Sequence, residues 1–171
     1  MNLIVNPTGQ AFWNNTSYRC ALGRGGVSPR KEEGDGITPA GMFELRRVFF
    51  RPDRVKAPPT SLPVTALRPT DGWCDHPEHK SYNEHVMLPF DGHHETLWRD
   101  DYIYDLIVVV GHNDQPVVRG KGSAVFIHIA APNYRETEGC IAFSKTHLLQ
   151  ILDQWSTGSK LEIRPYCTNG G

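Results

Sequence analysis

Residues 125–141 decide this fold and read Val-Phe-Ile-His-Ile-Ala-Ala-Pro-Asn-Tyr-Arg-Glu-Thr-Glu-Gly-Cys-Ile. An apolar run leads to His128, and after a short loop Gly139 and Cys140 precede a second apolar segment. The pattern predicts two neighbouring β-segments whose ends carry an imidazole and a thiol. A thiol at neutral pH is only slightly ionised, and a nearby imidazole can act as its base. The alternative is a buried structural cysteine beside a satisfied core histidine.

The segments on both sides of this stretch favour short strands. We predict them at residues 3–5, 12–20, 43–50, 64–67, 104–110, 123–129 and 160–164. Residues 144–155 are the one long amphipathic helix, with Ser144 as N-cap and Gly158 placed to end it. Residues 31–36 form a polar, glycine-rich loop, and residues 95–100 form one helical turn.

These elements predict a mainly β domain, with strands folded into two facing sheets or a flattened barrel and one α-helix after Cys140. The length suits a single domain over residues 1–171, with its core at about residues 20–164. A cleft is expected where the strand ends at Val110 and His128 meet the Gly139–Cys140 turn. The expected core is Val108–Val110, Val125–Ile127, Leu148, Leu149 and Leu152.

Charge and hydropathy exclude several classes of partner. The formal net charge is −1 and the pI is near 6.7, with charges of both signs interleaved, so nucleic acid is not an expected partner. No apolar run is long enough for a membrane span. The first residues lack the basic and apolar parts of a secretory signal, so we expect a cytoplasmic protein, or a periplasmic one if the sequence is trimmed.

A histidine-rich segment offers a second chemistry. Cys74, His76, His79 and His85 have side chains that bind zinc, although their spacing matches no familiar zinc finger. The alternative is a solvated surface loop. His112 follows the most β-prone run, at a strand end where site residues gather, and is either a site residue or a turn histidine.

Several separate motifs resemble the L,D-transpeptidase catalytic domain family, also called YkuD. A histidine on a strand is followed by Thr137, Glu138, Gly139, Cys140 and Ile141, and an upstream Thr-Pro-x-Gly-x-Phe element occupies residues 38–43. More specifically, the chain resembles a compact branch of short, stand-alone members. That likeness rests on residues 33–36, 72–75, 82–83, 111–114 and 122–128.

Two positions depart from the family pattern. Many members have histidine directly before Gly-Cys, where this chain has Glu138, and arginine two residues after the cysteine, where it has Ala142. An arginine there is a natural partner for a substrate carboxylate. Arg24, Arg119 or Arg135 could take its place.

The resemblance implies acyl transfer on peptidoglycan tetrapeptide stems. Cys140 would attack the carbonyl before the terminal D-Ala, with His128 as base and His112 in reserve. A backbone carbonyl would orient His128, and the N–H groups of Gly139 and Cys140 would stabilise the oxyanion. Thr137, Glu138 and Arg135 would contact the substrate. No cofactor is implied, and carbapenems would acylate the cysteine as they do in the family.

Four functions remain open at this point. With no route out of the cytoplasm, we favour an L,D-carboxypeptidase of muropeptide recycling, acting as a monomer. The same domain could be an L,D-transpeptidase that forms 3–3 cross-links. Residues 74–85 could instead form the site of a zinc-dependent hydrolase or zinc-binding module. The last alternative is a non-catalytic binder of peptidoglycan peptides.

Overall fold

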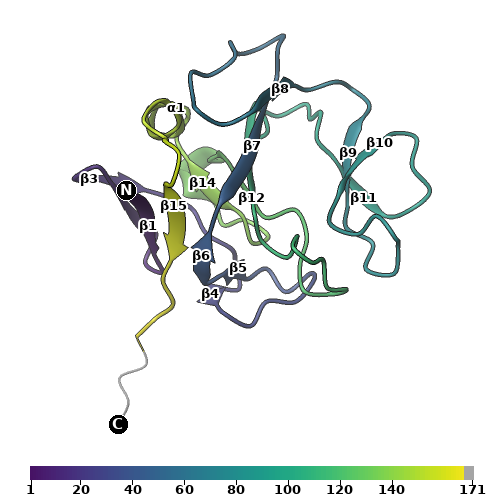
Figure 1. Ribbon diagram of the computed structural model, residues 1–171, viewed down its shortest axis with the longest axis horizontal. Helices are drawn as coiled ribbons and strands as arrows, with labels where there is room; N and C mark the ends of the chain where they lie inside the picture. Colours follow the sequence, from purple (N-terminus) through teal and green to yellow (C-terminus); the bar gives the residue numbers. More distant parts are fainter. Residues whose placement is uncertain (168–171) are drawn as a thin grey trace.

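A computed structural model describes residues 1–167 and has a mainly β fold. Two five-stranded sheets contribute to one hydrophobic core, against which the helix α1 (Lys145–Asp153) also packs (Figure 1). A smaller three-stranded sheet lies on the other side of the second sheet. The predicted fold class, with one α-helix after Cys140, is confirmed. Within the described residues, no helix has the length and apolar character needed to cross a bilayer.

The first sheet joins the two ends of the chain. Its order is β3 (Thr16–Arg19), β2 (Gln10–Trp13), β1 (Asn2–Asn6), β15 (Lys160–Ile163) and β6 (Gly41–Phe43). β1 and β15 are parallel, with Leu3 beside Leu161. β2 and β3 form a hairpin through Asn14 and Asn15, which have φ of 48° and 61° as a type I′ turn requires. The predicted strand at residues 12–20 is therefore two strands and a turn.

The second sheet positions the site residues. Its order is β14 (Ile141–Phe143), β13 (Phe126–Ile129), β12 (Leu106–Val110), β7 (Leu45–Phe50) and β8 (Val64–Ala66). All five residues of β12 are buried, because both faces of this sheet are covered. β13 and β14 are parallel neighbours, as the opening stretch predicted.

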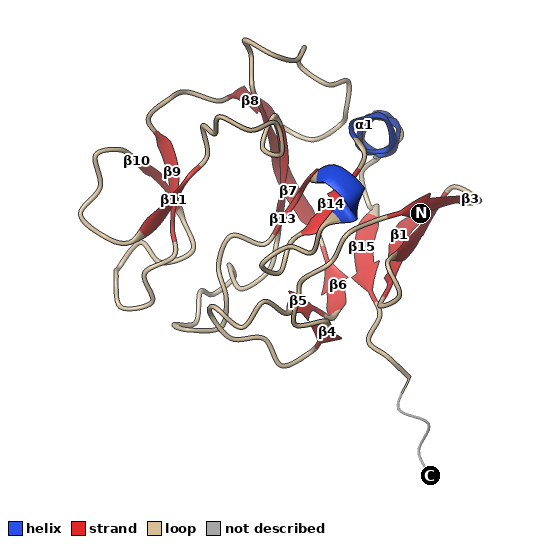
Figure 2. Ribbon diagram, turned by 180° about the vertical axis from the view of Figure 1, so that it is seen from behind, coloured by secondary structure: helices blue, strands red, loops and turns tan. Residues whose placement is uncertain are grey.

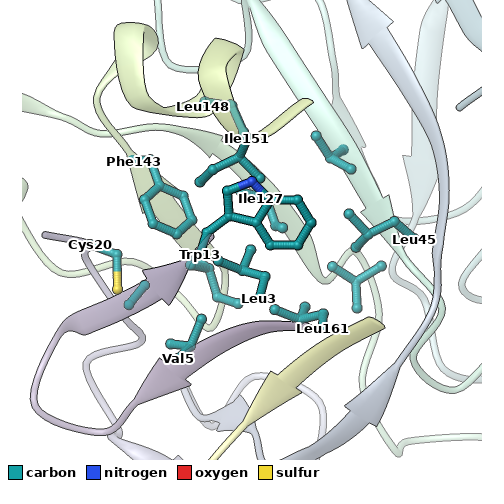
Figure 3. Close-up of a cluster of buried hydrophobic side chains, with 14 of the residues drawn as sticks. Leu3, Val5, Trp13, Cys20, Leu45, Ile127, Phe143, Leu148, Ile151 and Leu161 are labelled. Carbon is teal, nitrogen blue, oxygen red and sulfur yellow. The ribbon is translucent and has the colours of Figure 1, made fainter. Parts of the chain in front are cut away.

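The main core fills the space between the two sheets and α1. Trp13 lies at its centre, among Leu3, Ile127 and Ile151 (Figure 3). Its ring stacks on Trp155, with centroids 5.1 Å apart. Ser144 caps α1 as predicted, since its hydroxyl accepts a hydrogen bond from the His147 N–H at 3.2 Å. The helix ends at Asp153, five residues before Gly158.

Two core predictions need correction. Leu149 is only partly buried at the edge of the core, and Ile151 fills the position that we expected it to take. Val109 and Phe126 belong to a second cluster on the opposite face of the sheet, because neighbouring strand residues point to opposite sides.

That second face is covered by the sheet β10 (His85–Met87), β9 (Asp71–Cys74) and β11 (His94–Thr96). These strands lie on the far side of β7 and β12 from β1 and β15 (Figure 1). The predicted helical turn at residues 95–100 is wrong, because Glu95 pairs with Trp73 in a β-ladder that local propensity does not reveal. Long-range pairing outweighs a short polar helix signal.

Three short elements complete the fold. β4 (Val27–Ser28) and β5 (Thr38–Pro39) form a two-stranded parallel ladder, which includes the first residues of the Thr-Pro motif. The 3-10 turn η1 (Pro132–Tyr134) lies in the loop between β13 and β14, beside the second sheet in Figure 2. This loop returns the chain to the start of β14, where Cys140 lies.

Candidate active site

Cys140 and His128 lie on the same face of the second sheet. The β13–β14 register sets Ile127 beside Ile141 and His128 beside Ala142, so Cys140 lies next to Phe126. Phe126 and Cys140 both belong to the second cluster, and His128 is two residues further along the same strand. Strand spacing and a two-residue step place their Cα atoms about 8 Å apart. Both residues line one cavity.

Two backbone groups orient the Cys140 sulfur. The thiol donates to the Ala124 carbonyl at 3.3 Å, and the Phe126 N–H hydrogen-bonds to Sγ. Burial raises the pKa of the thiol to about 12, and the nearby Glu95 carboxylate raises it further. The resting sulfur is therefore a neutral thiol, whereas the sequence suggested a thiolate formed by the neighbouring imidazole. Deprotonation must accompany attack on the substrate.

His128 is held in one tautomer. Its Nδ1 lies 2.9 Å from the Ile129 carbonyl oxygen, which can only accept, so Nδ1 carries the proton and Nε2 is the basic nitrogen. This confirms the expected orientation by a backbone carbonyl. Burial lowers the pKa of His128 to about 4, so the ring is neutral at pH 7. The Tyr104 ring packs edge-on against it, with centroids 5.3 Å apart.

The turn before Cys140 is fixed by Thr137. Its hydroxyl donates to the Cys140 carbonyl at 2.7 Å and accepts from the Gly139 N–H at 3.1 Å. Gly139 has φ +130°, and a Cβ there would come within 2.8 Å of the Ile37 carbonyl oxygen, so glycine is required. Because its N–H is bonded within the turn, Gly139 is not the free oxyanion donor that we expected. The Cys140 N–H remains the candidate from this motif.

The cavity has a volume of about 420 Å³, in the range of small-ligand sites. It brings together six of the seven predicted site residues: His128, Arg135, Thr137, Glu138, Gly139 and Cys140. It lies where the turn meets β13 and the preceding residues 123–125, and Val110 is not in its wall. The location predicted from the Val110 strand end is therefore shifted along the sheet.

Charged residues that we did not predict line much of the remaining wall. They are Lys31, Glu33, Asp75, Glu95 and Arg99. Burial raises the pKa of Glu95, and its carboxylate accepts a hydrogen bond from the Tyr104 hydroxyl. The Glu33 carboxylate accepts hydrogen bonds from Tyr82 at 2.8 Å and from Ser123. The cavity therefore offers both signs of charge to a ligand.

His112 does not line this cavity. It packs edge-on against Phe43 and lines a second cavity of about 230 Å³ with Arg46 and His85. Burial lowers the pKa of His112 to about 4. His112 lies two residues beyond the end of β12, as the strand-end argument expected, but β13 separates β12 from the β14 end that carries Cys140, and the two side chains line different cavities. The structure gives no support to His112 as a reserve base.

The structure separates the three arginines considered for a substrate carboxylate. Arg24 pairs with Glu138 at 2.9 Å on the surface, where the Glu138 side chain is 78% exposed. Arg119 pairs with Glu78 at 3.3 Å, outside the cavity wall. Arg135 lines the cavity, and no ion pair to it occurs among residues 1–167.

The four histidine-loop residues do not converge. Cys74 is buried, and His85 bonds to Asp71 at 2.9 Å. His79 bonds to Asp91 at 3.1 Å, so its ring nitrogen faces another partner. In the part of the chain that the structure describes, no group of three His, Cys, Asp or Glu side chains could hold a metal ion. The zinc hypothesis therefore loses its geometric basis.

Asn83 connects the parts of the site. Its carbonyl accepts from the Trp73 indole and from the Ala124 N–H, both at 3.0 Å, and its amide donates to the carbonyls of His112 and Asn113. Ala124 has φ +51°, an unusual value for a residue with a side chain. The Asn83 bond helps to hold this conformation, which directs the Ala124 carbonyl at the Cys140 thiol.

We expect Asn83→Ala to lower the free energy of unfolding by about 3 kcal/mol or more, because it leaves buried donors and acceptors unpaired. Urea denaturation followed by fluorescence measures the change. Asn113→Ala is the control at another left-handed asparagine, whose side chain bonds only to its neighbouring loop. Equal stability of Asn83→Ala and the wild-type protein would contradict the role of Asn83.

One sequence signal could have identified the unpredicted residues. The segments that carried the family resemblance, such as residues 33–36, 72–75 and 82–83, come together around this cavity through Glu33, Asp75 and Asn83. They are far apart in the chain, so only their joint occurrence pointed to a common site. Lys31 and Arg99 carried no such signal.

Among comparisons with known proteins, the one with family models agrees with this architecture. The family model of the L,D-transpeptidase catalytic domain, YkuD, matches residues 3–163. No curated protein matches the chain. Among solved structures, the helical cell shape determining protein Pgp2 from Campylobacter jejuni is similar over 96% of this chain and 47% of its own, at 15% identity and a TM-score of 0.47. A mutant of the same protein is similar over 96% of this chain and 46% of its own, at 14% identity and a TM-score of 0.46. The chain thus spans about half the length of these proteins.

Proposed function

Because this chain belongs to the L,D-transpeptidase catalytic domain family, whose members are cysteine-dependent peptidoglycan enzymes, we propose that it is an L,D-carboxypeptidase. Its substrate would be a soluble peptidoglycan tetrapeptide stem, from which it removes the terminal D-Ala. The observation that carries the proposal is the presence of a buried thiol and an imidazole of fixed tautomer in the wall of one cavity.

In the first step, Sγ of Cys140 attacks the carbonyl carbon of the third stem residue. The thiol proton moves to Nε2 of His128 as the S–C bond forms, and the carbonyl π electrons move to oxygen. The Cys140 N–H stabilises this oxyanion. When the intermediate collapses, the C–N bond breaks and His128 returns its proton to the D-Ala amine, which leaves a thioester.

In the second step, water attacks the thioester, with His128 as base. The tripeptide leaves with a free carboxylate, and the proton returns to sulfur. Water is the abundant acceptor in the cytoplasm, where we propose that the protein acts on recycled muropeptides. A cavity of about 420 Å³ suits one ligand better than two large stems.

The direct experiment incubates purified protein with a soluble tetrapeptide and follows products by mass spectrometry. Carboxypeptidase activity gives a tripeptide and D-Ala. A cross-linked dimer without free tripeptide would show that the side-chain amine of a second stem is the acceptor, which is the transpeptidase alternative. Unchanged tetrapeptide would reject both. A carbapenem should add one equivalent of mass at Cys140, as the family resemblance implies.

Arg135 is the residue that we propose binds the carboxylate of the substrate. It lines the cavity, whereas Arg24 is paired with Glu138 on the surface. Arg135→Gln should raise KM about 10-fold to 100-fold with kcat little changed, because a charge-assisted hydrogen bond is lost equally in the ground and transition states. Initial rates of D-Ala release measure both constants. Arg119→Gln is the matched control, and an equal KM in the two variants would reject the assignment.

A further inference from the structure

Lys31 is a buried cation at the turn that carries Cys140. Its side chain is 6% exposed, although the sequence placed it in a polar surface loop. A Cβ on Gly139 would lie 3.1 Å from Nζ of Lys31, so the ammonium rests directly against this glycine. Lys31 and Cys140 line the same cavity.

The ammonium of Lys31 is only partly satisfied by the chain. It has three N–H donors and donates to Oδ1 of Asp35 at 3.2 Å. Across residues 1–167, no second hydrogen-bond acceptor for Nζ is present. A buried charge normally has its donors paired. The remaining donors are therefore available to a group that enters the cavity.

The turn itself supplies fewer oxyanion donors than its sequence suggests. The Gly139 N–H is engaged by the Thr137 hydroxyl, which leaves the Cys140 N–H. The position before Gly139, where many family members have histidine, is Glu138, which pairs outward with Arg24. Nζ of Lys31 places a further hydrogen-bond donor beside Gly139.

We propose that Lys31 is the side-chain donor to the oxyanion in the acyl-transfer step. Its ammonium stabilises the negative charge on the carbonyl oxygen when Cys140 attacks, and the charge is released when the leaving group departs. This inference rests on the proposed function for the identity of the acyl donor, but its chemistry applies to any acyl group that Cys140 accepts. The positive charge also favours the thiolate of Cys140.

The test measures acylation of Cys140 by p-nitrophenyl acetate, which passes through an oxyanion without peptide recognition. The rate of p-nitrophenol release is corrected with Cys140→Ala. We expect Lys31→Met to slow acylation about 10²-fold to 10³-fold, the usual loss for one oxyanion donor. On tetrapeptide, kcat should fall by a similar factor with KM nearly unchanged. Lys31→Arg, which keeps the charge, should recover part of the loss.

Two controls separate charge stabilisation from structural support. Asp35→Asn keeps the ammonium and one of the two oxygens that shape its loop, so it should lose less of the acylation rate than Lys31→Met. Lys121→Met removes an exposed lysine near Glu32 and should have no effect. If Lys31→Met does not fold, Lys31→Met combined with Asp35→Asn removes the unpaired carboxylate and gives the same readout.

Several results would overturn the proposal. The first is an equal acylation rate in wild type and Lys31→Met. The second is a loss of rate in Asp35→Asn as large as that in Lys31→Met. The third is a raised KM of Lys31→Met for tetrapeptide with unchanged kcat, which would indicate binding of a substrate carboxylate. A wild-type rate no higher than that of Cys140→Ala counts against it equally. If Lys31-dependent acylation occurs but the tetrapeptide is not cleaved, the proposed function fails and the role of Lys31 stands.

Discussion

Cys140→Ala should reduce kcat for D-Ala release by at least about 10⁴-fold, because it removes the atom that forms the thioester. No other described cysteine can substitute: Cys20 is buried in the main core, Cys74 lies on β9, and Cys167 is exposed near the end of the chain. The buried thiol is neutral, so its removal should change the free energy of unfolding by only about 1 kcal/mol. Release of D-Ala by a coupled assay and urea denaturation measure the two effects.

Cys167→Ser is the matched control, since it removes an exposed thiol and should leave the rate unchanged. Retained activity in Cys140→Ala would reject Cys140 as the nucleophile and favour a metal-dependent hydrolase. In that case, metal analysis of protein purified without a histidine tag would be the next measurement. Loss of activity together with loss of folding would be resolved by Cys140→Ser, which keeps the volume and a hydrogen-bond donor.

The predictable part of the fold is where local pattern and tertiary packing agree. The run at residues 106–110 is apolar throughout because both faces of β12 are covered, and such a run is visible without coordinates. The cap at Ser144 depends on one local hydrogen bond. By contrast, β11 forms because Glu95 pairs with Trp73 twenty-two residues earlier, and short-range signals do not encode that pairing.

The same distinction applies to the candidate site. Cys140 and His128 were found because a thiol and an imidazole end neighbouring segments, and the β13–β14 register sets both on one face. Lys31 was missed because a polar, glycine-rich segment reads as a solvated loop. Asp35 closes this loop by accepting the N–H groups of Glu32 and Ile37, which folds Lys31 inward. Burial of a lysine by its own loop leaves no pattern in the sequence.

The resting state of the thiol was also beyond sequence reasoning. A base beside a cysteine suggests a thiolate and an imidazolium, but burial disfavours the charged form of each group. It raises the pKa of Cys140 to about 12 and lowers that of His128 to about 4. The thiol and the imidazole are therefore both neutral between pH 4 and pH 12. The site is therefore arranged for proton transfer during attack, and its pH dependence should show this.

His128→Gln should lower kcat/KM by about 10²-fold to 10⁴-fold at pH 7, the usual contribution of a positioned general base. The wild-type ring is unprotonated above its pKa of about 4, so the wild-type rate should be nearly constant from pH 6 to pH 9. In His128→Gln no imidazole takes the proton, so attack requires a Cys140 thiol that has already lost its proton to solvent. Its rate should rise about tenfold per pH unit below the thiol pKa of about 12. Rates of D-Ala release across this range give both profiles.

Stability gives a second, independent readout of the same imidazole. Because burial lowers the folded pKa of His128 below its ordinary value of 6.5, the unfolded chain binds the proton first as pH falls. The stabilisation is complete above pH 6.5 and is lost as pH falls towards 4, by about 3 kcal/mol at most. Burial also lowers the pKa of His112 to about 4, so His128→Gln should remove about half of the stability that the wild-type protein loses in acid through these two rings. His112 lies outside the cavity, so His112→Gln should keep the rate profile flat. A flat rate profile in His128→Gln would mean that another group takes the thiol proton.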